Sequence, residues 1–518
     1  MALSKSRYTN FCQCDKMLWL QVHKPQEAQE DEGAQSSFET GRLVGKYAQQ
    51  LFHPFVDATQ LKPNGAQDRD AMLLRTRELL KAGTQNIAEA AFSWNGNYCA
   101  VDILHRTDKG YAIYEVKSTS SDSDDGNSPK ELLPYLQDVA YQKYVLSQCG
   151  ITVTGTYLVQ LNRAYVRGPQ LDIQQLFVVS DLAPFLDEES AKVPNNIAVA
   201  QNLLQQTAEP GTEMGRQCNN PNDCPFRNYC TKSLLHQVGS QVDFEHDITV
   251  LNFYRMPLKK KLELLKQGIV TMDQVDDIED LTKIQQLQVN NYISKADYID
   301  VVNIRKFLNE QIRYPLYFLD FETSQYAIPQ FEGSKPYQQI PFQYSLHYIE
   351  REGGALKHKE FLGDGKNDPR RALAEQLVAD IPMGVCTTAY NKAFECGRIK
   401  ELADLFTDLS EHLLDIRNHI VDFLDPFREG DFYKEQMMGS FSIKKVLPAL
   451  FPNDPSLDYH NLQGTVHNGA DAMTVYPLLA DMPLAQQQAT RESLLRYCEL
   501  DTYAMVKLWE KLVEVSQS

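Results

Sequence analysis

The feature that most constrains the fold is the apolar run 315–323, which reads Pro-Leu-Tyr-Phe-Leu-Asp-Phe-Glu-Thr. A run of this kind is typical of a strand buried inside a sheet. Strand and helix patterns alternate from Tyr314 to the C-terminus, as in an α/β domain. Residues two apart on a strand face the same side, so Asp320 and Glu322 share one face. Because buried acids are costly without a partner, the sequence predicts a metal ion beside them.

The rest of the chain is predicted to add two further regions. A length of 518 residues corresponds to roughly three domains of about 150 residues each. Residues 1–237 mix helical and strand patterns and are predicted to form one domain. Residues 238–312 show helical patterns with few strand signals, so we expect a helical connector before the α/β domain at 313–518.

Composition limits the class of protein. A content of 43% hydrophobic residues excludes wholesale disorder. No apolar run approaches the roughly 18 to 20 residues that span a bilayer, and the first eight residues lack an apolar signal core. We therefore expect a cytoplasmic protein with no membrane partner. The formal charge of −18 argues against tight, non-specific duplex binding, although a metal-dependent nuclease also needs carboxylates for its ions.

A first candidate site lies in the N-terminal domain. Residues 88–118 read as a three-stranded meander with turns at Asn-Gly and Lys-Gly. Asp102 falls in the second strand, and Glu115 and Lys117 share one face of the third. Adjacent carboxylates favour a cation between them, and Mg²⁺ prefers oxygen ligands. A nearby lysine can orient water or stabilise a phosphoryl charge. The alternative is plain Glu/Lys alternation on a solvent-facing strand.

Two neighbouring features extend this pattern: Glu89 lies one strand earlier, and a following helix carries Gln137, with Tyr141 four residues on, and Gln142. The arrangement resembles the RecB-like branch of the PD-(D/E)XK nucleases. The resemblance implies a restriction-endonuclease-like fold. Many relatives also carry a metal-binding histidine on an early helix, whereas residues 41–48 contain none.

The same resemblance assigns roles to individual residues. It implies that Asp102 and Glu115 bind the metal and that Lys117 is the catalytic lysine. It makes Glu89 an auxiliary acid. Either Gln137 or Gln142 would be the supporting glutamine of the family's helix, and the sequence leaves that choice open.

Three of the ten cysteines are evenly spaced, at Cys218, Cys224 and Cys230. A closed tetrahedral or cubane site needs a fourth thiolate. Cys12 and Cys14 are candidates, and Cys14, which precedes an apolar helical segment, fits better. One early and three late cysteines resemble the iron–sulphur subset of these nucleases, including the CRISPR-associated RecB-like exonucleases. This implies a structural [4Fe–4S] cluster; zinc, or plain buried thiols, are the alternatives.

The acids of the C-terminal domain belong to a second pattern. Asp320 and Glu322 are followed by Asn-Lys-Ala-Phe-Glu, ending at Glu395, and then by Tyr497 and Asp501 on one face of an amphipathic helix. These segments resemble, in order, the three motifs of DEDD-type, ribonuclease-H-like 3′–5′ exonucleases. The resemblance implies that the aspartates and Glu322 bind two divalent ions and that Tyr497 orients the attacking water. Glu395 stands where the family usually has Asp.

Two nearby segments allow other interpretations. His467 and Asp471 are reminiscent of the family's histidine-type third motif, although their spacing is one residue short. Lys444 and Lys445 could contact phosphates, or the segment could simply be a serine-capped helix start.

Together these patterns predict a metal-dependent nuclease with two active sites, using Mg²⁺ or Mn²⁺ on nucleic acid. DNA is favoured over RNA, and single-stranded ends are expected. The whole resembles a bacterial family with an uncharacterised C-terminal domain. The alternative is a nucleic-acid-binding or scaffold protein of nuclease ancestry, which the missing histidine and Glu395 favour. A carbohydrate- or ester-cleaving enzyme fits poorly, since there is no Gly-x-Ser-x-Gly motif.

Overall fold

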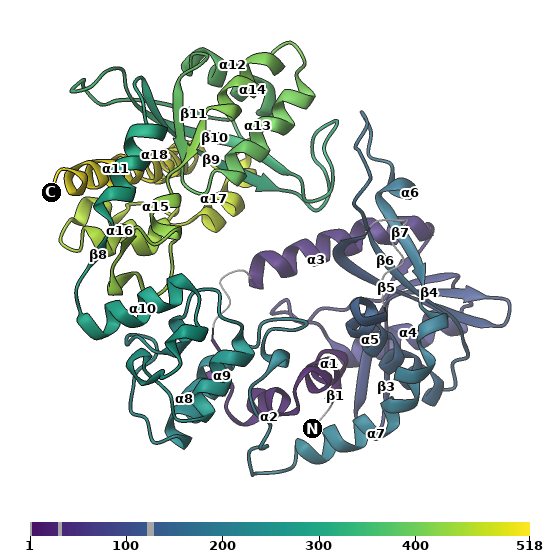
Figure 1. Cartoon of the computed structure of the whole chain (residues 1–518). Coiled ribbons are helices and arrows are strands. Elements are labelled where there is room, and N and C mark those ends of the chain that lie inside the picture. The colour runs from purple at the N-terminus through teal and green to yellow at the C-terminus, as the bar shows by residue number, and fades with distance from the viewer. Residues whose placement is uncertain (1–2, 30–33, 122–128) are drawn as a thin grey trace. The chain divides into compact units, whose positions relative to one another are not determined.

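The computed structural model describes residues 3–29, 34–121 and 129–518. The chain forms two compact units, each of which mixes helices and strands (Figure 1). The first unit comprises Met1–Leu234 and Tyr326–Gln338, and the second comprises Leu235–Gln325 and Gln339–Ser518. The predicted mixture of helices and strands is therefore confirmed. Residues 238–312, predicted as a connector, lie within the second unit.

The first unit is built on one sheet of seven strands, in the order β2-β3-β4-β5-β6-β7 with β1 beside β4. The strands are β1 (Leu3–Ser4), β2 (Val56–Asp57), β3 (Asn86–Trp94), β4 (Asn97–Thr107), β5 (Gly110–Ser121), β6 (Val153–Asn162) and β7 (Phe177–Asp181). The antiparallel run β3-β4-β5 confirms the predicted meander. Asn95 and Gly96 both have positive φ, at 51° and 78°, as an Asn-Gly hairpin turn requires.

Helices cover both faces of this sheet. They are α1 (Lys5–Gln13), α2 (Asp15–His23), α3 (Ala34–Gln49), α4 (Arg69–Lys81), α5 (Pro129–Gln148), α6 (Ile173–Leu176), α7 (Asp187–Leu203) and α8 (Arg227–Gln237). On one face, Leu104 and Ile113 pack in a core with residues of α1, α2, α5 and α7. On the other, Ile103 packs with Val44 and Ala48 of α3. The alternation along β4 is the period of two that a sheet covered on both faces requires.

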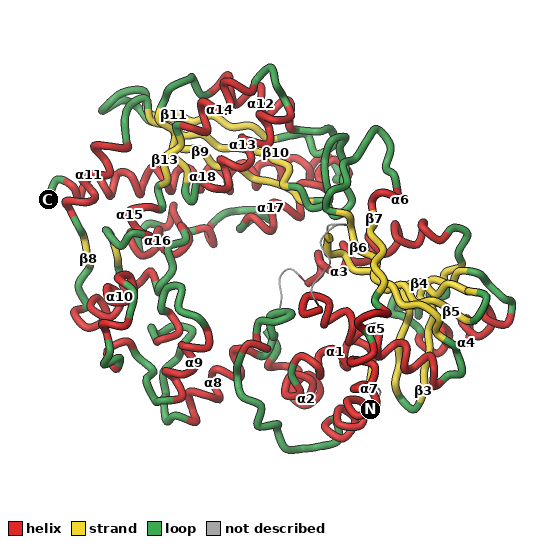
Figure 2. The backbone as a smooth tube through the Cα atoms, turned by 45° about the vertical axis from the view of Figure 1, so that its right-hand side comes forward, coloured by secondary structure: helices red, strands yellow, loops and turns green. Residues whose placement is uncertain are grey.

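The second unit contains a five-stranded sheet in the order β11-β10-β9-β12-β13 (Figure 2). Its strands are β9 (Leu316–Gln325), β10 (Gln339–Ile349), β11 (Lys357–Leu362), β12 (Cys386–Ala389) and β13 (Ile420–Asp422). Strand β10 is antiparallel to β9 and β11, whereas β12 is parallel to β9 and β13. The predicted buried strand is thus the central strand β9. A separate ribbon pairs β8 (Tyr298–Ile299) with β14 (Phe432–Tyr433).

The helices of the second unit cover both faces of its five-stranded sheet. They are α9 (Leu258–Lys266), α10 (Lys283–Ser294), α11 (Val301–Gln311), α12 (Arg370–Asp380), α13 (Ala393–Leu405), α14 (Ser410–Asn418), α15 (Asp425–Arg428), α16 (Ile443–Leu450), α17 (Gly469–Val475) and α18 (Leu484–Ser516). Leu319 and Phe321 of β9 pack in one core with residues of α12, α13 and α14. Phe318 faces the opposite side, in the core that contains α18. Asp320 and Glu322 share that second side.

Membrane crossing was tested on the part of the chain that the structure describes. None of its helices combines the length and the apolar character that crossing a bilayer demands.

Candidate functional site

Three acids of the second unit form a compact group. One carboxylate oxygen of each of Asp320, Glu322 and Asp501 lies within 4.8 Å of the others. The first two come from alternate positions of β9, and Asp501 comes from α18, which crosses the same face of the sheet. Glu322 and Asp501 are buried, and Asp320 is half-buried. The structure therefore brings together acids that are far apart in the sequence.

The electrostatics of the group favour a bound cation. Burial, and then the charge of Asp501, raise the pKa of Glu322 to about 8. Burial raises the pKa of Asp501 to about 6. Burial and the charges of these two neighbours also raise the pKa of Asp320 well above its usual range. Carboxylates held this close must take up protons or share a cation to relieve their repulsion.

Two tyrosines and a lysine surround Asp501. Tyr459 donates a hydrogen bond to Asp501 Oδ1 at 2.6 Å, and Tyr497 also hydrogen-bonds this carboxylate. Lys444 Nζ lies 5.4 Å from the ring centre of Tyr459 and 5.6 Å from that of Tyr497. Its charge lowers the pKa values of Glu322 and Asp501. The sequence reasoning missed Tyr459, which begins a short 3-10 helix (Tyr459–Asn461) and has no motif spacing to reveal it.

Lys444 belongs to the segment with two interpretations. Helix α16 starts at Ile443 after Ser442, so the predicted helix start is present, but the Ser442 side chain makes no capping hydrogen bond. The position of Lys444 beside the acids is compatible with the other interpretation, a contact with phosphate.

Glu395 lies at the edge of the acid group. It is buried on α13, and its charge raises the pKa values of Asp320 and Glu322. Burial raises its own pKa to about 8, and the charge of Asp422 at the end of β13 adds to the shift. Its Oε2 atom has no hydrogen-bond partner among the described residues. Glu395 is thus near the three acids but is not one of the tight group.

The rival third motif also lies near the acids, since α17 packs against β9 and Gly469 lies beside the carboxylate of Glu322. Asp471 Oδ2 accepts the backbone N–H of His467 at 2.8 Å, at the start of α17. The tight group contains Asp501 and not Asp471. Of the two aspartates that the sequence offered for the third motif, Asp501 on α18 is the one that joins Asp320 and Glu322.

The predicted residues of the first unit also come together. The register that pairs Ile103 with Tyr114 brings Asp102 opposite Glu115. Asp102 Oδ2 accepts the N–H of Val116 at 2.7 Å, and Lys117 Nζ lies 2.7 Å from Glu115 Oε1. Burial and the charge of Glu115 raise the pKa of Asp102 to about 6. Against the effect of its burial, the charges of two lysines hold the pKa of Glu115 well below its usual range.

Glu89 on β3 lies next to Asp102, so acids of three neighbouring strands, β3, β4 and β5, lie side by side. The β3–β4 register passes from Ala88–Ile103 to Ala90–Val101, which sets Glu89 opposite Asp102. Its φ of 54° is rare for a residue other than glycine, and such strain persists only where the surroundings enforce it. Burial, and next the charge of Asp102, raise its pKa to about 8.

Helix α5 supplies the supporting glutamine. Gln142 Nε2 donates to Glu115 Oε2 at 2.6 Å and to Asp138 Oδ1 at 2.9 Å. Of the two glutamines that the sequence left open, Gln142 is therefore the one that contacts Glu115, whereas Gln137 is half-buried. Asp138 also accepts a hydrogen bond from Lys117 at 2.7 Å. Asp138 was missed, although its position one helical turn before Gln142 could have suggested it.

Lys5 is a second residue that the sequence reasoning missed. Its ammonium contacts both oxygens of Glu115, at 2.9 and 3.1 Å, and Asp138 Oδ1 at 3.7 Å. No spacing rule connects α1 with β5, so no sequence signal could have found this lysine. Two ammonium groups, from Lys5 and Lys117, thus neutralise Glu115.

Four thiols of the first unit line one pocket. They are Cys14, Cys218, Cys224 and Cys230. All are free thiols, and Cys14, Cys224 and Cys230 each lie close enough to Cys218 for its charge to raise their pKa values. Burial, above all, raises the pKa of Cys224 to about 11 and that of Cys230 to about 12. The thiol of Cys12 instead lies near Tyr8, so Cys14 is the early cysteine of this group.

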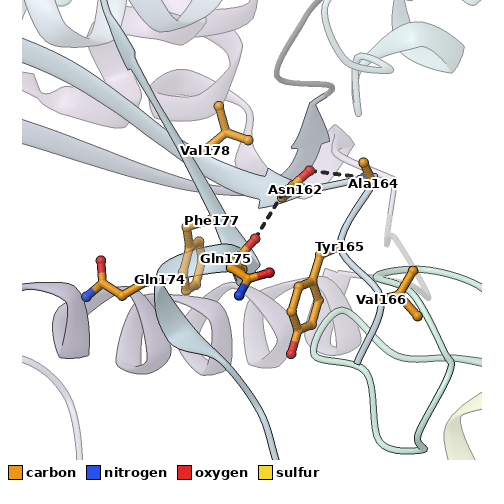
Figure 3. A pocket seen from close by; sticks show the side chains of 8 residues that line it. All are labelled: Asn162, Ala164, Tyr165, Val166, Gln174, Gln175, Phe177 and Val178. Carbon is orange, nitrogen blue, oxygen red and sulfur yellow. Dashed lines mark hydrogen bonds between the residues drawn. The ribbon is translucent and has the colours of Figure 1, made fainter. Parts of the chain in front are cut away.

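A surface hollow at β6 and β7 lies apart from these sites (Figure 3). Its lining residues include no acid, base or cysteine. The side chain of Asn162 is used locally, donating to the carbonyl of Gln175 and accepting the N–H of Ala164, both at 3.0 Å. The hollow therefore offers no side chain suited to metal binding or proton transfer.

Comparison with known proteins finds that about a quarter of the chain is similar to a described family model. Residues 317–442 match the domain of unknown function DUF2779. This match includes Asp320, Glu322 and Glu395 and ends before Asp501. The chain is also 27% identical over 225 residues to the "Uncharacterized protein MG366 homolog" of Mycoplasma pneumoniae. That similarity covers 40% of this chain and 34% of the relative, so the chain spans about a third of the relative's length.

Proposed function

We propose that the protein is a metal-dependent nuclease with two separate active sites, the second of which is a 3′–5′ exonuclease. The observation that carries the proposal is the convergence of Asp320, Glu322 and Asp501, one oxygen of each within 4.8 Å of the others. Their raised pKa values and their all-oxygen donor set suit Mg²⁺ or Mn²⁺.

In the second site, these three acids would hold two divalent ions, and the unpartnered oxygen of Glu395 is available to them. Such ions stabilise the attacking and the leaving oxygen of a phosphodiester. Tyr497, beside Asp501, orients the attacking water. The ammonium of Lys444 lies close enough to Glu322 and Asp501 for its charge to lower their pKa values. At that position, its positive charge would attract the phosphate of the substrate.

In the first site, Asp102 and Glu115 would hold the ion that polarises the phosphodiester. Lys117 positions the nucleophile, and Gln142 keeps Glu115 oriented through its 2.6 Å hydrogen bond. The ammonium of Lys5 must release Glu115 before an ion binds there, because it contacts both carboxylate oxygens. Glu89, opposite Asp102, serves as an auxiliary acid.

We further propose that the four grouped thiols hold a [4Fe–4S] cluster, with zinc as the alternative. They fit such a group because all four are free and line one pocket. The cluster would tie the junction of α1 and α2 to residues 218–230 and so stabilise the domain. Protein purified without oxygen should be brown, with iron and sulphide near the stoichiometry of one cluster. Colourless protein that contains zinc would contradict this assignment.

The proposed function also implies a fold for each domain and a class of substrate. The N-terminal domain, 1–237, would have the PD-(D/E)XK restriction-endonuclease-like fold, and 313–518 the ribonuclease-H-like fold, joined by the helical region 238–312. The substrate would be nucleic acid with single-stranded ends, with DNA favoured over RNA, in the cytoplasm. The net charge of −18 fits binding at ends more than coating of duplexes.

Cleavage of end-labelled, single-stranded DNA and RNA with Mg²⁺ or Mn²⁺ tests the proposal. The variants are Asp102→Ala and Asp320→Ala, alone and combined, with the exposed acids Asp108→Ala and Asp481→Ala as matched controls. We expect each site variant to remove one activity, the double variant to remove both, and the controls to match wild type. Stepwise shortening of a 5′-labelled strand, blocked by a 3′ modification, is expected from the second site.

A second candidate function is nucleic-acid binding without cleavage, as in a scaffold of nuclease ancestry. The pairing of Lys5 with Glu115 and the position of Glu395 outside the tight group favour it. Wild-type protein that binds oligonucleotides but cleaves none of them with either ion would support this function and reject the nuclease proposal.

A further inference from the structure

A second group of potential metal ligands lies beside the acids of the second unit. It consists of His347 on β10, His358 on β11 and Glu499 on α18, one ligand atom of each within 4.8 Å of the others. His347 and His358 are directly paired across the two strands, and their ring centres are 4.5 Å apart. His347 is buried, His358 is half-buried and Glu499 is exposed, so the group is open to solvent on one side.

This group is distinct from the acid group. Along β10, Ser345 is paired with Asp320, and His347 is paired with Phe318. The histidines thus lie further along the sheet from the acids, under the same helix α18. Nothing in the proposed nuclease chemistry uses them.

Hydrogen bonds fix the protonation of both imidazoles. Thr502 Oγ1 lies 3.1 Å from the carbonyl of Glu499, which can only accept, so the hydroxyl donates there. Thr502 Oγ1 therefore accepts from Ser345 Oγ at 2.6 Å and from His347 Nδ1 at 2.8 Å. Ser345 Oγ in turn accepts from His358 Nε2 at 2.9 Å. These bonds use His347 Nδ1 and His358 Nε2, so the lone pairs of His347 Nε2 and His358 Nδ1 are available to a metal as far as the described residues show.

Charge at the group also suits a cation. Burial, and next the charge of His358, lower the pKa of His347 to about 4, so this imidazole is neutral at pH 7, as a ligand must be. Glu360 lies two residues after His358. Burial, and also the charge of Glu499, raise the pKa of Glu360, so its carboxylate lies near the group and offers another oxygen ligand. Metal-binding histidines usually donate their other N–H to a fixed acceptor, and here the two hydroxyls supply one for each ring.

We propose that His347, His358 and Glu499 bind a divalent transition-metal ion such as Zn²⁺, at a site separate from the Mg²⁺ or Mn²⁺ site of the nuclease. Two imidazoles and one carboxylate select such an ion over Mg²⁺, which prefers oxygen ligands alone. Three protein ligands leave a fourth position for water. The ion would tie β10 and β11 to α18 at Glu499, two residues before Asp501, and so hold that helix on the sheet.

Zinc stoichiometry of the full chain tests the site. Metal-stripped protein is titrated with Zn²⁺ in excess Mg²⁺, and wild type is compared with His358→Gln and Glu499→Gln. The matched control is His246→Gln, an exposed histidine of the same unit. We expect each site variant to bind one equivalent fewer than wild type and the control to bind the same number. Ser345→Ala, which removes the partner of His358, should weaken this equivalent by about 10- to 100-fold.

Two results would overturn the site. The first is equal stoichiometry in wild type and both site variants, with all proteins showing the same circular dichroism. The second is loss of the same equivalent in Asp320→Ala, which would assign the zinc to the acid group. Because binding is measured and not cleavage, an inactive nuclease that retains the His358-dependent equivalent would leave the zinc site standing and reject only the proposed function.

Discussion

Replacing Asp501 by Asn should stabilise the metal-free protein at pH 8, even though it removes a proposed catalytic ligand. Burial raises the pKa of Asp501 from its ordinary 3.8 to about 6, so ionisation costs more in the folded protein than in the unfolded chain. A difference of about 2 pH units corresponds to about 3 kcal/mol. Asn keeps the shape of Asp, and its amide oxygen can still accept the hydroxyl of Tyr459, so the gain in unfolding free energy approaches that figure.

The pH dependence has a definite sign. The folded-state pKa of Asp501 lies above the unfolded value, so the folded protein binds more protons between about pH 4 and 6. The wild type therefore loses stability as the pH rises through this window, and the loss is complete above it. The Asn variant has no such carboxyl, so its advantage should grow over the same window and be largest at pH 8.

Thermal unfolding of wild type and Asp501→Asn, in EDTA at pH 4 and pH 8 and again with Mn²⁺, measures the effect. At pH 8 in EDTA, we expect the variant to melt roughly 6 to 12 °C higher, given about 2 to 4 °C per kcal/mol for a unit of this size. The difference should be small at pH 4. With Mn²⁺, wild type should gain stability and the variant should gain little. The control Asp481→Asn, an exposed acid, should match wild type throughout. A variant that melts at or below wild type in EDTA at pH 8 would refute the reasoning.

Three further predictions concern other parts of the two units. Lys117→Met, made with Asp320→Ala to silence the second site, should lower the remaining cleavage rate by about 10²- to 10³-fold, because it removes the cation beside Glu115; an unchanged rate would show that this lysine is not catalytic. Cys224→Ser should lose iron and sulphide and about 2 to 5 kcal/mol of stability, as expected for a staple that closes a long loop; iron analysis and denaturant unfolding check this, and full iron content would contradict it. Tyr459→Phe removes the hydroxyl that donates to Asp501 at 2.6 Å, a bond to a charged group worth about 1.5 to 3 kcal/mol. Calorimetric titration should therefore show weaker Mn²⁺ binding, by about tenfold or more, and unchanged affinity would mean that this tyrosine does not support the site.

Local periodicity determined much of what the sequence could predict. The Asn-Gly turn and the alternation of the strands fixed the meander that carries Asp102 and Glu115, because turns and strand faces depend on neighbouring residues. The same rule placed Asp320 and Glu322 on one face of β9. Helical spacing placed Tyr497 and Asp501 together on α18. Each of these relations spans a few residues, so it can be read without knowing the rest of the fold.

Choices between equivalent candidates needed the tertiary structure. Gln137 and Gln142 lie on one helix, and only the packing of α5 shows that Gln142 contacts Glu115. Asp471 and Asp501 both belong to plausible motifs, on helices that both pack against β9, but only Asp501 places a carboxylate oxygen within the group of Asp320 and Glu322.

Residues that act through distant contacts had no signal in the sequence at all. Lys5 contacts Glu115 from another element, and Tyr459 contacts Asp501 from a short 3-10 helix. His347 and His358 approach Glu499 where two strands pass beneath α18. The amino-acid sequence by itself determined which side chains share a strand or helix face, since that is set by backbone geometry. Which faces meet was decided only by the burial of apolar surface over the whole unit, and the partners of each charged group follow from that.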